Sequence, residues 1–445
     1  MKKRKFLHLI PLLPLLHLIH LIPLLPFLLS GFSLSAQTDT LKVMQYNLLN
    51  YGNNTGYCNT TNNNINDKNA CIRTILTAYY PDIFTVCEVG RSSNLPNDFV
   101  NNNLNINGVT YWKTSAGANS ANSSLTNCIF YNSDKLTLTA HHMAQTYIRD
   151  VDVYDFKFKN DNSGNIVLTC VVAHLKAGDS SDDEQKRATM ATNIMNYLEN
   201  HYRECNVLIM GDFNLYNSSE PAYQTLTNQT VYQNSYFIDP VYPYGVGYWN
   251  NNSYYKNYHT QSTHGNNDSS CHSSGGMDDR FDFILMSENI YGGRDGIRYV
   301  NGTYNALGQD GQRFNKSINN PSNQAVSQEV ANALFNNSDH LPVTMEISVT
   351  YNIGVNEYQD NNLSFDFFPN PTNDKINIRF YQDNIGKANI LLINTLGQIV
   401  YSNDVFVNDN VSEHVITVEN LPKGIYFLRI TNTDGLIGTS KIIVE

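Results

Sequence analysis

The chain has 445 residues, of which 41% are hydrophobic, and its formal net charge at pH 7 is −11. This length and apolar content exclude a wholly disordered chain and allow one large domain followed by a smaller one. The negative charge argues against a broadly basic surface of the kind that holds nucleic acid through phosphate contacts, although a local basic patch is compatible with it.

Residues 1–36 have the composition of a signal peptide. Four cations at positions 2–5 ("KKRK") precede a Leu/Ile/Pro/His stretch that ends in "SLSAQ", where small residues precede a cleavage site at Gln37. A transmembrane anchor is the alternative, but several prolines interrupt the apolar stretch. We therefore expect export, removal of residues 1–36 and no transmembrane segment in the mature chain.

The seven cysteines include no CxxC pair, which argues against both a zinc ribbon and a disulfide framework. Cys87, Cys128 and Cys170 lie in strand-like runs, and we expect them to be small buried hydrophobes. Cys58 and Cys71 flank an Asn-rich loop, and in an exported protein we expect these two to form a disulfide.

From residue 41 onward, strand and helix signals alternate. "LKVMQYN" predicts a strand, "KNACIRTILTAYY" an amphipathic helix and "PDIFTVCEVG" a second strand. Antiparallel-looking runs follow, namely "NCIFYNS", "VYDFKFK" and "NIVLTCVVAHL". "SSDDEQKRATMATNIMNYLENHY" then predicts a helix with a capping serine and an apolar face. The strands "VLIMGDFN", "DRFDFILMS" and "HLPVTMEISVTY" complete this region near residue 351.

Residues 241–275 form a long segment rich in Tyr, Asn, Ser and His, with few aliphatic side chains. Such a loop is either a functional lid or a disordered insert, and both alternatives stay open. Its aromatic residues could stack on unpaired bases or pack on the domain surface. They are Tyr242, Tyr244, Tyr248, Trp249, Tyr254, Tyr255 and Tyr258. The irregular spacing of His259, His264 and His272 argues against a second metal site.

The C-terminal part of the sequence changes character. Residues 352–363 ("NIGVNEYQDNNL") form a polar linker, and residues 364–445 show strand alternation between turn signals such as "PNP" and "KG". This pattern predicts a small all-β sandwich.

Polar side chains follow four strands that two crossovers connect. Asn47 and Glu88 stand at the ends of the strands in the first crossover. His174 and Asp212 end the strands of the second, with Asn214 two residues further on. Because right-handed crossovers bring the carboxyl ends of parallel strands to one edge of a sheet, we expect these side chains to converge.

Three more polar residues belong to the same expected constellation: Asp282 in "RFDFIL", and Asp339 and His340 in "SDHLPV". Each polar residue taken alone is more often a solvated or structural side chain. Together, carboxylate and amide oxygens suit Mg²⁺, Mn²⁺ or Ca²⁺. Two histidines beside such an ion suit phosphodiester hydrolysis, and an aspartate next to a histidine fixes its tautomer.

The motifs "QYNLLNYG", "TVCEVG", "AHLKAG", "MGDFNLY", "RFDFIL" and "SDHLPV", in this order over about residues 41–350, resemble the endonuclease/exonuclease/phosphatase superfamily. Its members include pancreatic-type deoxyribonucleases, abasic-site endonucleases and bacterial sphingomyelinases. The resemblance implies an α+β fold, a four-layer αββα sandwich of two packed sheets that binds metal and phosphate at one edge.

Roles follow from the resemblance, residue by residue. Glu88 is expected to be the principal metal carboxylate, with Asn47 beside it and Asp339 contributing. Asp212 and Asn214 are expected to orient the attacking water and the phosphate oxygens.

The remaining roles concern proton transfer and substrate contact. His340, polarised by Asp282, is expected to hydrogen-bond the phosphate or act as general base. His174 is expected to contact the phosphate or protonate the leaving oxygen, and Arg149 resembles a substrate-binding arginine. The sequence departs from the pancreatic deoxyribonucleases because no glutamate that could pair with His174 is evident between Arg91 and Arg149. This departure bears on the deoxyribonuclease assignment more than on hydrolysis.

The motifs "FPNPTNDKINI", "NTLGQIV", "LPKGIYFLRI" and "SKIIVE" resemble the C-terminal sorting domains of type IX secretion in diderm bacteria. The resemblance implies contact with that machinery and passage from the periplasm across the outer membrane, followed by cleavage or surface attachment. A carbohydrate-binding or adhesive β-module is the alternative.

The sequence therefore predicts a monomeric, secreted or surface-attached phosphodiesterase that depends on a divalent metal, with residues 37–351 as its catalytic domain. A nuclease acting on DNA or RNA is the first hypothesis. The same site acting on phospholipid head groups, nucleotides or sugar phosphates is the second, and an inactive surface binding protein is the third.

Overall fold

The computed structural model describes most of the chain after residue 36. The residues described are 37–203, 205–228, 236–241, 247–265, 271–351, 365–380, 386–407, 412–432 and 437–445. The predicted signal peptide (1–36), the predicted linker (352–363), Tyr242 and Tyr244 lie outside them.

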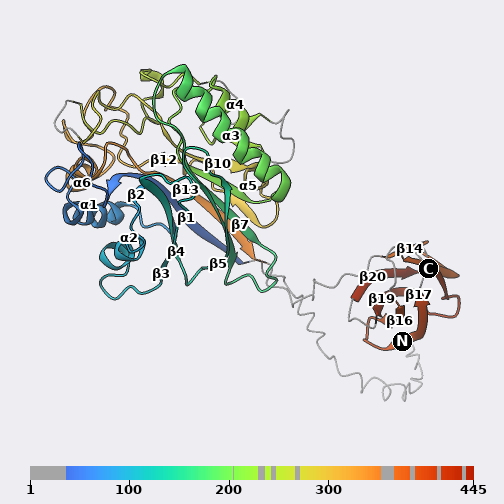
Figure 1. The fold of residues 1–445 in the computed structure, drawn as a ribbon. Coiled ribbons are helices and arrows are strands. Elements are labelled where there is room, and N and C mark those ends of the chain that lie inside the picture. The colour runs from blue at the N-terminus through green and yellow to red at the C-terminus, as the bar shows by residue number, and fades with distance from the viewer. Residues whose placement is uncertain are drawn as a thin grey trace, which may run out of the picture.

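Two mixed β-sheets make up the larger part of the structure (Figure 1). The first has the strand order β11-β13-β1-β2-β4-β3, with β12 paired to β13. Its strands are β1 (Gln37–Tyr51), β2 (Ile83–Gly90), β3 (Trp112–Ala116), β4 (Leu125–Asn132), β11 (Ile297–Tyr299), β12 (Asn305–Ala306) and β13 (Val343–Tyr351). The second has the order β5-β6-β7-β8-β10-β9. Its strands are β5 (Leu136–Gln145), β6 (Val151–Phe158), β7 (Val167–His174), β8 (Val207–Asp212), β9 (Phe237–Ile238) and β10 (Asp282–Ser287).

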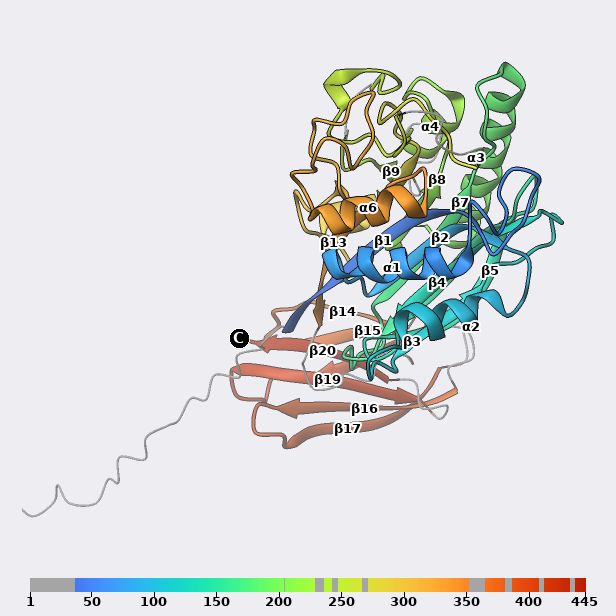
Figure 2. The same cartoon turned by 90° about the vertical axis from the view of Figure 1, so that its left-hand side faces the viewer.

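Helices cover the outer face of each sheet. The first sheet carries α1 (Ile65–Ala78), α2 (Leu95–Phe99), the π-helical turn Val100–Leu104 and α6 (Gln328–Asn337), as Figure 2 shows. The second carries α3 (Ser181–His201) and α4 (Pro221–Thr227). Two short elements complete the set, α5 (Glu288–Gly292) and the 3₁₀ turn Ser253–Tyr255. Among the described residues, no helix combines the length and apolarity needed to cross a bilayer.

The core lies in three apolar layers. One fills the space between the two sheets and includes Val43, Ile83 and Ile284. The other two lie between each sheet and its own helices. This helix-sheet-sheet-helix order confirms the four-layer α+β sandwich predicted from the sequence, because each sheet is apolar on both faces and must be covered on both.

Both predicted crossovers are present. Strands β1 and β2 pair in parallel and are connected along the chain through α1. Strands β7 and β8 pair in parallel and are connected through α3. Helix α3 begins where its sequence indicates, because the Ser180 side chain accepts a hydrogen bond from the Asp183 amide. Its buried face includes Ile194 and Met195, both with no exposed surface.

Residues 365–444 form two further antiparallel sheets with a core of their own. One has the order β14-β15-β18 and the other β17-β16-β19-β20. The strands are β14 (Phe365–Phe368), β15 (Lys375–Phe380), β16 (Gly386–Asn394), β17 (Ile399–Val407), β18 (Ser412–Thr417), β19 (Gly424–Asn432) and β20 (Ile437–Val444). Side chains such as Ile378 and Leu428 are fully buried between the sheets. The predicted all-β sandwich is confirmed.

Candidate metal and catalytic site

Four polar side chains meet at the edge where the parallel strands end. Strands β7 and β8 are in register so that His174 lies beside Asp212. Strands β1 and β2 are in register so that Asn47 lies beside Cys87, next to Glu88. The two crossovers therefore deliver residues from distant parts of the sequence to one place, as the topology requires.

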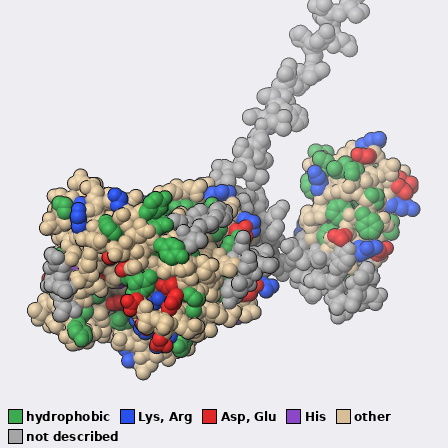
Figure 3. Space-filling view, turned by 90° about the horizontal axis from the view of Figure 1, so that it is seen from above, with side chains coloured by type: hydrophobic (Ala, Val, Ile, Leu, Met, Phe, Trp, Pro, Cys, Tyr) green, Lys and Arg blue, Asp and Glu red, His purple; other side chains and the backbone are tan. Residues whose placement is uncertain are grey.

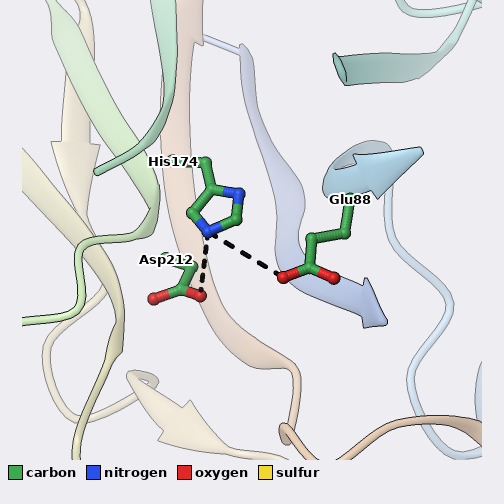
Figure 4. Close-up of side chains that lie close together, drawn as sticks. All are labelled: Glu88, His174 and Asp212. Carbon is green, nitrogen blue, oxygen red and sulfur yellow. Dashed lines mark ion pairs between the residues drawn. The ribbon is translucent and has the colours of Figure 1, made fainter. Parts of the chain in front are cut away.

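The strand ends form a compact cluster of potential metal ligands. His174 Nε2 lies 3.5 Å from Asp212 Oδ2 and 3.9 Å from Glu88 Oε1 (Figure 4). One donor atom from each of these three residues lies within 4.8 Å of the other two. Asn47 Nδ2 lies between the carboxylates and donates to Glu88 Oε1 at 3.1 Å and to Asp212 Oδ2 at 2.9 Å.

A histidine-aspartate pair adjoins this cluster. His340 Nδ1 lies 2.7 Å from Asp282 Oδ2, and His340 Nε2 lies 3.7 Å from Asp212 Oδ2. Strand β10 brings Asp282 there, because its antiparallel register with β8 places Asp282 opposite Asp212. The Nδ1 nitrogen thus faces a carboxylate, and the Nε2 nitrogen faces the cluster.

The other predicted residues lie around the same edge. Asp339 Oδ2 accepts a hydrogen bond from the Ser273 amide at 2.9 Å, and its Oδ1 lies 4.0 Å from His340 Nε2. Arg149 and Asn214 both donate to the Leu175 carbonyl, at 2.7 Å and 3.3 Å. Since Leu175 directly follows the last residue of β7, this contact places both side chains beside the cluster.

The structure thus brings every predicted site residue to one edge, but it groups them differently from the predicted metal set. That set was Asn47, Glu88 and Asp339. Among the described His, Cys, Asp and Glu residues, the group that could hold an ion is Glu88, His174 and Asp212. The role of each residue stays a prediction.

Backbone conformation at the edge is unusual. Glu88 has φ of +63° at a register shift between Val86 and Val89. Ile148, next to Arg149, has φ of +66°, which is rare for a β-branched residue. Such strained positions persist only where the surroundings impose them, and they concentrate at functional sites.

Carboxylate charges compete at the centre of the site. Burial, helped by the charges of Asp282 and Glu88, raises the pKa of Asp212 to about 7 against the opposing effect of His340 and Asn47. A buried carboxylate with a raised pKa beside other carboxylates is the arrangement that a divalent cation stabilises, because the cation replaces a proton as the counter-charge. The donor set therefore fits a hard divalent ion.

The two histidines differ in charge preference. Burial lowers the pKa of His340, but Asp282 and Asp212 raise it more, so that it stands well above the usual value. Burial lowers the pKa of His174 well below the usual value, and Arg149 and His340 add to the effect. His174 is therefore neutral, the form in which a ring nitrogen can accept a proton or bind a metal.

Three further residues touch the site, although the sequence alone assigned none of them a role. Gln261 Nε2 lies 2.7 Å from His340 Nε2. The Asn50 amide donates to Glu88 Oε2 at 3.0 Å. Ser338 Oγ donates to the Asn47 carbonyl at 2.7 Å. Asn50 and Ser338 belong to the motifs "QYNLLNYG" and "SDHLPV", which is a signal for them, but Gln261 lies in a loop without any motif.

The expected disulfide between Cys58 and Cys71 is wrong. Cys58 pairs with Cys271, 213 positions away, while Cys71 is a half-buried free thiol. Pairing by proximity in the sequence failed because Cys71 belongs to α1, whereas Cys58 faces the loop that contains Cys271. Three cysteines are buried as predicted, namely Cys87, Cys128 and Cys170.

In the Tyr- and His-rich segment 241–275, some of the described aromatic side chains are buried and others are exposed. Trp249 is fully buried and packs against Phe283, whereas Tyr248 and Tyr254 are 59% and 81% exposed. His259 is buried, with its ring nitrogens 2.7 Å and 3.2 Å from backbone carbonyls. Part of the loop thus belongs to the core, and two tyrosines face solvent.

Comparison with known proteins identifies the C-terminal region. Residues 366–445 match the family model described as "Secretion system C-terminal sorting domain". This region resembles a secretion sorting domain. The match confirms the resemblance inferred from its motifs. No curated protein matches the chain.

Solved structures are similar to the larger region. An endonuclease/exonuclease/phosphatase family protein from Bacteroides thetaiotaomicron is 16% identical, covers 71% of this chain and 97% of its own, and gives a TM-score of 0.42. The human Nocturnin catalytic domain with bound sulfate is 14% identical over 71% and 98%, with a TM-score of 0.42. A humanized D. rerio TDP2 is 14% identical over 69% and 98%, with a TM-score of 0.43. Members of the endonuclease/exonuclease/phosphatase family are thus among the structures to which the chain is similar.

Proposed function

We propose that this protein is an exported phosphodiesterase that depends on a divalent metal, with nucleic acid as its first candidate substrate. One observation carries the proposal: the ligand cluster of Glu88, His174 and Asp212 lies directly beside the His340–Asp282 pair. A phosphodiester needs charge neutralisation of its oxygens and proton transfer during attack by water, and this arrangement offers groups for both.

Glu88, Asp212 and His174 would hold the ion, with the Asn47 amide orienting both carboxylates. Mg²⁺, Mn²⁺ and Ca²⁺ fit a site dominated by carboxylate oxygens. When bound, such an ion neutralises charge on the phosphate oxygens and lowers the pKa of a coordinated water.

The chain's own groups would manage the protons. His340, held at Nδ1 by Asp282 at 2.7 Å, presents Nε2 to the cluster and would accept a proton from the attacking water or hydrogen-bond the phosphate. As an alternative to binding the ion, His174 would contact the phosphate or, once protonated, donate a proton to the leaving oxygen. Asn214, whose amide N–H donates to Asp212 Oδ1 at 3.0 Å, would orient the water and the phosphate.

Substrate choice depends on what reaches the site. On the face that Figure 3 shows, the described Lys and Arg side chains are scattered rather than gathered, so steering by a basic patch finds no support there. The exposed Tyr248 and Tyr254 offer rings on which unpaired bases could stack, which favours single-stranded over double-stranded nucleic acid.

A second candidate substrate class is a small phosphoester, such as a phospholipid head group, nucleotide or sugar phosphate. It is favoured by the narrow access to the site, because the side chains of Asp212 and His340 are only 2% and 5% exposed. An inactive binding protein is disfavoured, since a site without chemistry gains nothing from keeping buried carboxylates together.

The test is a substrate panel at fixed ionic strength. The mature chain, stripped with EDTA and reloaded with Mg²⁺, Mn²⁺ or Ca²⁺, is incubated with plasmid DNA, single-stranded DNA, RNA, bis-p-nitrophenyl phosphate and sphingomyelin. We expect hydrolysis that EDTA abolishes and a divalent ion restores. Turnover of only the small esters would reject the nuclease, and inertness toward the whole panel with every ion would reject the phosphodiesterase.

We also propose the domain division 37–351, 352–363 and 364–445, with the last segment directing export to the medium or the cell surface. The match of residues 366–445 to sorting domains supports this division.

A further inference from the structure

Gln261 is in contact with the histidine of the proposed site, although no motif identifies it. Its Nε2 lies 2.7 Å from His340 Nε2 and donates to Asp339 Oδ2 at 3.3 Å. A glutamine amide nitrogen carries two N–H groups and no acceptor. The two contacts use one N–H each, which orients the amide toward both residues.

The backbone around Gln261 is held from two sides. Its own N–H donates to the Asp279 carbonyl at 3.0 Å, and its carbonyl accepts from the amides of Asp278 and Asp279 at 2.9 Å and 3.0 Å. On the other side, the Leu341 amide donates to the Thr260 carbonyl at 2.7 Å.

The next residue pair extends this arrangement. The Thr263 amide donates to the Asp339 carbonyl at 3.0 Å. Backbone hydrogen bonds therefore hold the segment 260–263 against residues 339–341. This stretch includes Asp339 and His340, which the side chain of Gln261 contacts. A side chain on so constrained a backbone keeps its direction.

The neighbours of His340 determine which of its nitrogens carries the proton in the neutral ring. Asp282 Oδ2, an acceptor, faces Nδ1 at 2.7 Å, and the Gln261 amide, a donor, faces Nε2 at 2.7 Å, which the Asn47 amide approaches less closely, at 3.5 Å. The neutral imidazole that satisfies both has its proton on Nδ1 and its lone pair on Nε2. This is the tautomer that can accept a proton on the side of the cluster.

We propose that Gln261 is a positioning residue for the proposed hydrolysis: its amide holds the Nε2 lone pair of His340 toward the site until a water or phosphate oxygen replaces it. The inference rests on the proposed function, in which His340 accepts a proton or hydrogen-bonds the phosphate. The inference adds the side-chain amide of Gln261 to the site. This residue lies outside the strand-end motifs, in a loop to which the sequence alone assigned no definite role.

The experiment compares Gln261→Ala and the isosteric Gln261→Glu in the mature chain. Gln328→Ala, which changes an exposed glutamine at the start of α6, is the matched control. Either change at position 261 removes the nearer of the two amide donors to Nε2, and glutamate also faces Asp339 with a second negative charge. We expect kcat to fall roughly 10- to 100-fold, as for one hydrogen bond to a reacting group, with KM changed less than about twofold. The control should keep both constants.

A second measurement does not need turnover. In protein labelled with ¹⁵N-histidine, recorded at a pH high enough to deprotonate the His340 ring and with its signals assigned by their loss in His340→Gln, the wild type should show a non-protonated Nε2 and a protonated Nδ1. Both position-261 variants should show exchange between the two tautomers.

The possible outcomes are decisive. Wild-type kcat in both variants, an unchanged ring spectrum, or loss of folding in both variants would overturn the inference, the last because it would make Gln261 a structural residue. If the wild type hydrolyses nothing in the substrate panel, the proposed function fails, while the ring spectra still decide whether Gln261 selects the tautomer.

Discussion

Asp212 is the residue on which most contacts of the site converge. Its Oδ2 accepts from Asn47 Nδ2 at 2.9 Å and lies 3.5 Å from His174 Nε2 and 3.7 Å from His340 Nε2. A carboxylate with so many polar neighbours in a buried site is held in one orientation, which is what a metal ligand requires. Its chemistry therefore depends on neighbours from two strands, β1 and β7, and from the loop before β13.

Replacing the central groups should abolish turnover without unfolding the chain. Asp212→Asn and His340→Ala should each lower kcat by about 10²- to 10⁴-fold, because each removes a group that touches the reacting atoms. The control is His142→Ala, whose side chain is 48% exposed. Thermal unfolding measured by circular dichroism should show that each variant keeps a cooperative transition. Wild-type turnover in both site variants would contradict the mechanism.

Lys68 allows a prediction about pH. It is buried beneath the site, where its Nζ donates to the Asn337 carbonyl at the end of α6. Burial lowers its pKa from 10.5 to about 8, against the opposing effect of Asp339 and Glu88. The charged ammonium is thus disfavoured in the folded state, and this penalty is present in full below pH 8.

As pH rises from about 8 to about 10.5, the unfolded chain binds more protons at this group than the folded chain, so the free energy of unfolding should rise. Relative to Lys68→Met, the wild type should gain up to about 3 kcal/mol over this window. Urea unfolding of both proteins at several pH values measures the difference. Parallel pH dependences of the two proteins would show that Lys68 has its ordinary pKa in the folded state.

At the scale of elements, the disulfide connects two loops that support the site. Asn50, whose backbone amide contacts Glu88, also donates from its side chain to Cys58 Sγ at 3.6 Å. The partner cysteine, Cys271, is two residues before Ser273, whose amide contacts Asp339. The bond therefore fastens the loop beside Glu88 to the loop beside Asp339.

Removing this bond should weaken both stability and metal binding. Cys58→Ser with Cys271→Ser should lower the free energy of unfolding by about 2 to 5 kcal/mol, the range typical of a native disulfide. It should also lower Mn²⁺ affinity measured by titration calorimetry, because the two loops lose their mutual support. Cys205→Ser, at a half-buried cysteine outside the disulfide, should leave both unchanged. Unaltered Mn²⁺ affinity in the double variant would show that the loops hold the site without the bond.

Some elements were predictable and others were not, for identifiable reasons. Strands β2 and β8, each the parallel partner of another strand in its own sheet, are short apolar runs bounded by turn residues. Such runs are a strong signal for a buried strand. β5 went unpredicted because its sequence, "LTLTAHHMAQ", is half polar, and register shifts interrupt its pairing with β6. α6 was missed because ten residues with one apolar stripe give little periodicity to detect.

At the scale of the whole molecule, the described C-terminal sheets have their own core, which includes Ile390 and Ile430. A region with its own core can fold independently of the rest. We propose that export and chemistry are therefore divided between two folding units.

A variant that ends after Tyr351 tests this division. It should keep its cooperative unfolding, metal binding and turnover in vitro within about twofold of the mature chain, because every residue of the proposed site precedes that position. Expressed in a diderm host with type IX secretion, it should stay in the periplasm, where fractionation and immunoblotting would detect it. Appearance of the truncated protein in the medium would contradict a sorting role for residues 364–445.

The local sequence by itself determined the strands of the two crossovers and the edge at which their polar ends meet, because backbone periodicity and the handedness of crossovers are short-range properties. Only the tertiary structure decided that Cys58 pairs with Cys271 and that Gln261 lies on His340. These contacts depend on how long loops close over a finished sandwich, and neither residue spacing nor hydrophobic pattern records the path of a loop between its ends.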